Sequence, residues 1–111
     1  MVKYNGDEEL DLIFHALSDT TRRQILETIA KKSCTVSELA EPYAMSLAAI
    51  SKHLKVLEKA GFVSRTKEGR IHRCQLNPKP ILTAEKQLAS LSDMWSKKLD
   101  ALDDYFKKIK D

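Results

Sequence analysis

Apolar residues recur three and four positions apart along the first part of the chain, which is the spacing of one face of an α-helix. The pattern predicts a helix over about residues 7–17 and a second helix over about residues 20–31. Ser18 and Asp19 separate the two helices and carry side chains of the kind that cap helix N-termini. The apolar stripes are Leu10, Ile13, Phe14 and Leu17 in the first helix, and Ile25, Leu26 and Ile29 in the second.

A short helix and a longer one are predicted next. Thr35 and Glu38 have the spacing of a capping box, which starts a short third helix. Ser46 caps a fourth helix over about residues 46–60, and Gly61 ends it because glycine readily takes the left-handed conformation found there. The fourth helix has two unlike faces. One face carries Ile50, Leu54 and Leu57, and the opposite face carries Ala48, Lys52, Lys55 and Lys59.

A β-hairpin and a long helix complete the pattern. Residues 62–65 and 71–76 are predicted as strands joined by a turn at residues 66–70. The last helix, over about residues 82–108, spans about 40 Å, which is longer than a globule of this size needs, and it carries an apolar stripe. The stripe therefore favours a dimer interface over a monomer's core. Its members are Leu88, Trp95, Leu102 and Ile109 at seven-residue spacing, beside Leu91, Leu99 and Phe106.

Positive charge is concentrated in the segment 46–76. The chain of 111 residues has a net charge of +3, but this segment alone holds seven Lys or Arg against two Glu, a net of +5. The longest apolar runs are too short for a transmembrane helix, and the polar, acidic N-terminus does not resemble a secretory signal. Two cysteines without paired spacing favour reduced thiols. The expected location is the cytoplasm, with no role at a membrane.

This order of elements predicts a mainly α protein with a small β-hairpin: a winged helix-turn-helix of about five helices and a two-stranded wing, formed as one domain over 1–111. The recognition helix would be 46–60 and the wing about 62–76. A cationic helix followed by a cationic hairpin suits a helix in the major groove with a loop reaching the flanking backbone. The residues expected to contact double-stranded DNA are Ser46, Ala48, Ala49, Ser51, Lys52, Lys55, Arg65, Lys67 and Arg70.

Three segments closely resemble bacterial transcriptional regulators of the ArsR/SmtB family. They are LIFHALSDTTRRQILETI (12–29), TVSELAEPYAMSLAAISKHLKVLEKAGFVSRTKEGR (35–70) and the terminal helix that carries Trp95. The stretch SKHLKVLEKAG (51–61) is the most specific part. The resemblance implies a homodimer built from the first and last helices, which binds a palindromic operator, usually as a repressor. The implied dimer interface is Leu10, Phe14, Leu88, Leu91, Trp95, Leu99, Leu102 and Phe106.

Metal sensing is where the chain departs from the family. Thr35 and Ser37 stand where many members carry a Cys-x-Cys pair, and the last helix has acids but no histidine. Zinc and similar metals need nitrogen or sulfur ligands, so we expect no metal and no cofactor. Release from DNA would then follow from an unidentified small-molecule inducer, from thiol chemistry or from a change in protein level.

Several residues have more than one interpretation. His53 is expected to be structural, between the fourth helix and the wing, with phosphate contact as the alternative. Arg22 could contact DNA or pair with acids of the first or third helix. Cys34 could be a thiolate activated by the helix dipole, although a buried small residue is the simpler interpretation. Cys74 is expected in the core.

Two other functions stay open at this stage. A winged helix that has lost DNA binding would be a protein-interaction module, but the charge of the wing argues against it. A regulator that responds to oxidation through Cys34 is the second alternative. An enzyme is not supported, because the sequence has no glycine-rich phosphate loop, no nucleophile–base ordering and no paired catalytic carboxylates.

Overall fold

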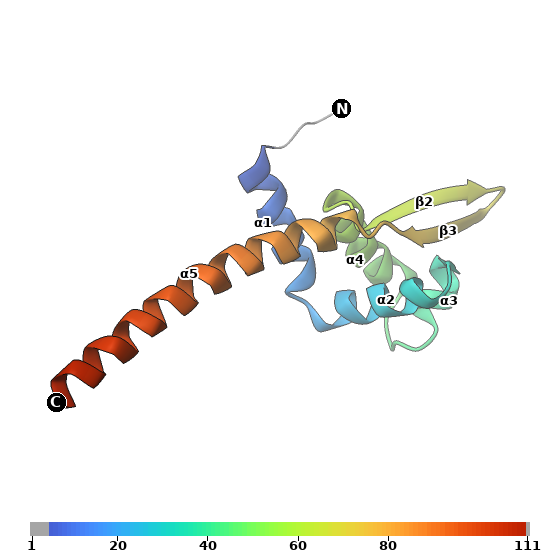
Figure 1. Ribbon diagram of the computed structural model, residues 1–111. Helices are drawn as coiled ribbons and strands as arrows, with labels where there is room; N and C mark the ends of the chain where they lie inside the picture. The colour runs from blue at the N-terminus through green and yellow to red at the C-terminus, as the bar shows by residue number, and fades with distance from the viewer. Residues whose placement is uncertain (1–4, 111) are drawn as a thin grey trace.

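The computed structural model describes residues 5–110, which form a winged helix-turn-helix with one very long terminal helix (Figure 1). The predicted fold class is confirmed: the chain is mainly helical, with five helices and a small antiparallel wing. The elements are α1 (Gly6–Leu17), α2 (Thr20–Lys31), β1 (Cys34–Thr35), α3 (Val36–Ala40), α4 (Leu47–Lys59), β2 (Val63–Glu68), β3 (Ile71–Leu76) and α5 (Lys79–Lys110).

Side-chain caps fix where the helices begin. Asp19 accepts a hydrogen bond from the backbone N–H of Arg22 at 3.0 Å, and Ser46 accepts one from Ala49 at 3.1 Å. Thr35 and Glu38 form the predicted capping box at the start of α3. Each cap satisfies backbone donors that the first turn of a helix leaves without a partner. At the other end of α4, Gly61 has a φ of +86°, the left-handed conformation expected there.

The inner face of α4 forms the middle of the hydrophobic core. Its three predicted apolar residues, Ile50, Leu54 and Leu57, have no solvent exposure. Helices α1, α2 and α3 and strand β2 all pack against this helix. Phe62 and Cys74 of the wing are equally buried and close the core from the sheet side. The position of α4 is therefore fixed from every neighbouring element, and only its outer face remains free.

The sheet has three strands rather than two, in the order β1–β3–β2. The two-residue strand β1 was not predicted, because a strand this short has no period of its own. The predicted five-residue turn of the hairpin was also wrong. Strand β2 continues to Glu68 opposite Ile71, so the connection is only Gly69-Arg70. Gly69 has a φ of +62°, as the first position of a tight hairpin turn of this kind requires.

Helix α5 begins three residues earlier than predicted. Lys79 and Pro80 lie in its first turn, where proline is tolerated because its missing N–H would have no partner there. Only Pro80 and Ala84 of this helix are buried. The remainder crosses α1 and then extends away from the rest of the molecule (Figure 1). Within residues 5–110 no helix is both long and apolar enough to cross a lipid bilayer.

Arg22 joins α1, α2 and α4 at one buried point. Its guanidinium donates hydrogen bonds to the carbonyl oxygens of Ala16 and His15, both at 2.9 Å, and contacts Nδ1 of His53 at 3.3 Å. Of the two interpretations left open for this arginine, the hydrogen bonds support the structural one, although its partners are the last carbonyls of α1 rather than acids of α1 or α3. A cation at this place complements the negative end of the α1 dipole.

We expect Arg22→Met to lower the free energy of unfolding by about 2–4 kcal/mol, because two buried carbonyls would be left without their charged donor. Arg23→Met is the matched control, since Arg23 is exposed and also bonds the end of α1. The control should cost less than about 1 kcal/mol. Urea denaturation followed by circular dichroism measures both, and equal losses in the two variants would contradict the structural role of Arg22.

Candidate nucleic-acid interface

The outer face of α4 is cationic and sterically open. Lys52 and Lys55 are exposed, and Ala48, one turn before Lys52, is exposed beside them. Ala49 and Ser51 are half-buried at the edge of this face, and Ser46 is exposed at its N-terminus, where its hydroxyl caps the helix. A small residue followed by two lysines lets a helix backbone approach a polyanion closely while the ammonium groups reach its phosphates.

The wing presents two free cations at its tip. Lys67, near the end of β2, and Arg70, in the turn, are both exposed, and the two strands extend away from α4 on the side opposite to the free end of α5 (Figure 1). Their position at the end of a hairpin suits contact with a backbone or groove beside the one that α4 would occupy.

Arg65 differs from the other predicted contacts. Its Nε donates to Oε1 of Glu58 at 2.5 Å, and the two side chains are only 21% and 33% exposed. This ion pair connects β2 to the last turns of α4. From the sequence, Arg65 was expected to contact DNA together with the other cations. The ion pair could not be predicted, because it joins residues seven positions apart in two different elements. Its charge is already largely balanced within the chain.

His53 lies on the inner side of the recognition helix, as predicted, but its neighbours were not foreseen. Its Nδ1 is 3.3 Å from Nη1 of Arg22 and 3.9 Å from Oδ2 of Asp19, so the ring packs toward α2 rather than toward the wing. The pKa of the Asp19 carboxyl is lowered, mainly by the hydrogen bond from the Arg22 backbone and further by the charges of His53 and Arg22. The cluster holds α4 against the start of α2.

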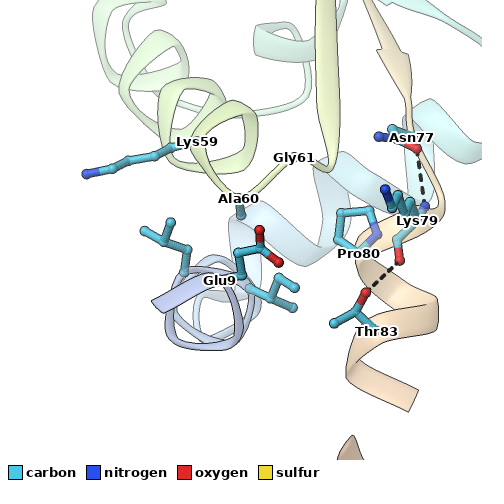
Figure 2. A pocket seen from close by; sticks show the side chains of 10 residues that line it. Glu9, Lys59, Ala60, Gly61, Asn77, Lys79, Pro80 and Thr83 are labelled. Carbon is cyan, nitrogen blue, oxygen red and sulfur yellow. Dashed lines mark hydrogen bonds between the residues drawn. The ribbon is translucent and has the colours of Figure 1, made fainter. Parts of the chain in front are cut away.

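A hollow of about 240 Å³ lies where the start of α5 meets α1 and the end of α4 (Figure 2). Pro80, Leu12 and Ile13 give it an apolar floor, and Lys59, Lys79 and Glu9 stand at its rim. Figure 2 shows Asn77 accepting from the Lys79 backbone and Thr83 donating to the Lys79 carbonyl, both within the chain. The hollow is thus part of the joint between the globular part and α5.

The two thiols and the acids of α5 have ordinary structural surroundings. Cys34 is buried, and burial, then the nearby Glu38 carboxylate, raises the pKa of its thiol rather than lowering it. The interpretation as a buried small residue is confirmed.

On α5, Asp93 pairs with Lys97 at 3.3 Å and Asp103 with Lys107 at 3.1 Å. Across the described residues, no three His, Cys, Asp or Glu side chains are grouped as metal ligands.

The predicted dimer interface is largely uncovered in the single chain. Leu10 is half-buried and Phe14 is 36% exposed, while Trp95 and Leu99 on α5 are 68% and 62% exposed. From residue 88 to residue 110 every side chain is exposed. The other large apolar residues of this part of α5 that are more than a third exposed are Leu88, Leu91, Met94, Leu102, Tyr105, Phe106 and Ile109.

The fold and the cationic face together define a winged helix-turn-helix transcriptional regulator. Residues 19–65 match the model of the bacterial regulatory protein family arsR. The chain is 38% identical over 84 residues to the HTH-type regulator YuzN of Bacillus subtilis, covering 69% of this chain and 89% of that protein. The transcriptional repressor SdpR of the same organism is 35% identical over 59% of this chain and 72% of its own length.

A solved structure agrees with these relatives. The crystal structure of an ArsR family transcriptional regulator has a TM-score of 0.78 and 38% identity, covering 86% of this chain and 97% of that one. The chain belongs to the ArsR family, as the sequence segments indicated.

We expect Lys52→Ala/Lys55→Ala to weaken DNA binding by about tenfold or more, because two positive groups leave the outer face of α4. The slope of log affinity against log salt should fall by about one for each phosphate that is no longer neutralised. Fluorescence anisotropy on a duplex that the wild-type protein selects from a random-sequence pool measures both. The control is Lys107→Ala, far along α5, and a control that loses as much affinity as the double variant would refute this assignment.

Proposed function

We propose that this protein is a homodimeric repressor that reads a palindromic DNA operator with α4 and the wing. The observation that carries the proposal is the division of α4 into a fully buried inner face and a free cationic outer face. A helix held this firmly presents Lys52 and Lys55 as a rigid element, which lowers the entropy lost when DNA is bound.

Each predicted residue has a specific part in this proposal. Ala48, Ala49 and Ser51 allow the helix to enter the major groove, and Ser46 brings the helix N-terminus toward a phosphate. Lys52 and Lys55 bind phosphates and base edges. Lys67 and Arg70 at the wing tip reach the adjacent groove or its rim. Arg65 contributes least, because Glu58 already occupies its guanidinium.

A second copy of the chain is needed to complete the molecule. The exposed apolar stripe of α5 continues from the region where this helix packs on α1, so the same surface of a second copy can cover both helices. A two-fold arrangement places two recognition helices about 34 Å apart, which is one turn of DNA and the spacing of palindromic half-sites. Self-complementary burial of this kind is typical of obligate dimers.

The remaining parts of the proposal follow from the family. A transcriptional regulator works where the DNA is, so the cytoplasm is the proposed location, and no catalytic activity is assigned to it. A protein-interaction module remains the alternative, but the free cations of α4 and the wing tip have no use in it. We propose no resident metal or cofactor, and an inducer of unknown structure is compatible with the hollow beside α5.

Trp95→Glu/Leu102→Glu should convert the wild-type dimer to monomer at about micromolar concentration, because charges cannot be buried unpaired in the stripe, and specific binding should disappear with it. Sedimentation velocity and anisotropy on the selected duplex measure the two effects. The control is Lys97→Gln/Asp104→Asn, which changes polar residues two positions after Trp95 and Leu102, on the other side of the helix. This variant should stay dimeric. A monomeric wild-type protein that still binds a palindrome tightly would contradict the proposal.

We also expect zinc, cadmium and arsenite at low micromolar concentrations to leave operator affinity unaltered, since the described residues offer no set of nitrogen and sulfur ligands. Elemental analysis after dialysis should find no stoichiometric transition metal. A bound metal, or a tenfold loss of affinity on adding one, would overturn this and make Cys34 and Cys74 the first residues to change.

A further inference from the structure

The fold places the two cysteines of the chain directly opposite each other. Cys34 of β1 and Cys74 of β3 are register partners in the antiparallel sheet, although 39 residues separate them in the sequence. Side chains of directly paired residues point to the same face of a sheet. Both thiols are free and buried in the same core, at 7% and 0% exposure. Burial above all, then the Glu58 carboxylate and last the neighbouring Cys34 thiol, raises the pKa of Cys74.

Pairing in an antiparallel register brings two cysteines to a backbone separation that a disulfide can span. Paired residues of an antiparallel ladder have Cα atoms about 4.5–5.5 Å apart, within the range of about 4.4–6.8 Å that disulfides span. Only side-chain rotation is needed. The thiol of Cys34 now donates to the carbonyl oxygen of Lys32 at 3.1 Å, and turning Sγ from that oxygen toward Cys74 would exchange one weak hydrogen bond for the covalent bond.

We propose that Cys34 and Cys74 form a reversible cross-strand disulfide under oxidative stress, and that this bond clamps the DNA-reading part of the protein in its native geometry. The closed loop would contain α3, α4, β2 and the first part of β3, and so the whole helix-turn-helix with most of the wing. The disulfide would join residues that are already paired in the native sheet. Oxidation therefore stabilises the helix-turn-helix and the wing and does not distort them. This differs from a sensor in which oxidation of Cys34 releases the protein from DNA.

The chemistry balances with a peroxide as the oxidant. The Cys34 sulfur, the more exposed of the two, attacks the O–O bond of hydrogen peroxide and gives a sulfenic acid and one water. The Cys74 sulfur then attacks the sulfenic sulfur, which forms the S–S bond and releases a second water. The two thiols lose two protons and two electrons. Burial raises the pKa of both thiols, so the reaction needs sustained oxidant and the dithiol persists under ordinary reducing conditions.

The test treats the full-length protein with hydrogen peroxide, then alkylates the unfolded sample with iodoacetamide. Peptide mapping without reductant should join the peptides that carry Cys34 and Cys74, with a mass lower by two hydrogens. The melting temperature should rise by about 10 °C or more, because a loop of about 40 residues is closed in the unfolded state, and dithiothreitol should reverse the rise. Cys34→Ala is the control, which should show neither change.

A separate measurement distinguishes the clamp from a release switch and rests on the proposed function. The oxidised protein should bind the selected duplex within about twofold of the reduced protein. A loss of tenfold or more would overturn the clamp. So would two thiols that remain fully alkylated after peroxide, or a disulfide only between chains. Failure of the reduced protein to select any duplex would refute the proposed function instead, and the peptide map and melting temperature would still decide whether the bond forms and stabilises the fold.

Discussion

The burial of one face of α4 is the constraint on which the rest of the structure depends. Ile50, Leu54 and Leu57 have no solvent exposure, and three helices and a strand meet around them. Removal of such side chains from water supplies about 1.5–3 kcal/mol each, which is a large part of the stability of a domain this small. Because the inner face is fixed, the direction in which Lys52 and Lys55 point is fixed as well.

Two groups of cationic side chains around the helix-turn-helix and the wing have different tasks. Arg22 and Arg65 are withdrawn from solvent and hold elements together, the first at the end of α1 and the second between β2 and α4. Lys52, Lys55, Lys67 and Arg70 are exposed and remain free for a polyanion. A buried guanidinium must satisfy its donors within the chain, whereas an exposed ammonium keeps its water until a phosphate replaces it.

The single chain has a complete core at one end and an incomplete surface at the other. The globular part buries its apolar residues within itself, while α5 beyond Ala84 exposes a stripe that only another surface can cover. This imbalance links assembly to function. The packing that would cover the stripe also sets the distance between the two recognition helices of a dimer. That distance has to match the spacing of the two half-sites in a palindrome.

The sequence by itself determined the helices, their caps, the two faces of α4 and the family. These features depend on residues within one or two turns of each other: Asp19 and Ser46 cap from three positions away, and an apolar stripe needs no distant partner. The fold class and the free cations of the recognition helix could be predicted for the same reason.

Only the tertiary structure decided what depends on contacts between distant segments. The strand β1 exists because β3 lies beside it, and the same pairing brings Cys34 opposite Cys74. Likewise the sequence could not show that Glu58 binds Arg65, or that His53 packs on Arg22 rather than on the wing. Such pairings arise when the chain closes into a compact core, and no local period or spacing encodes them.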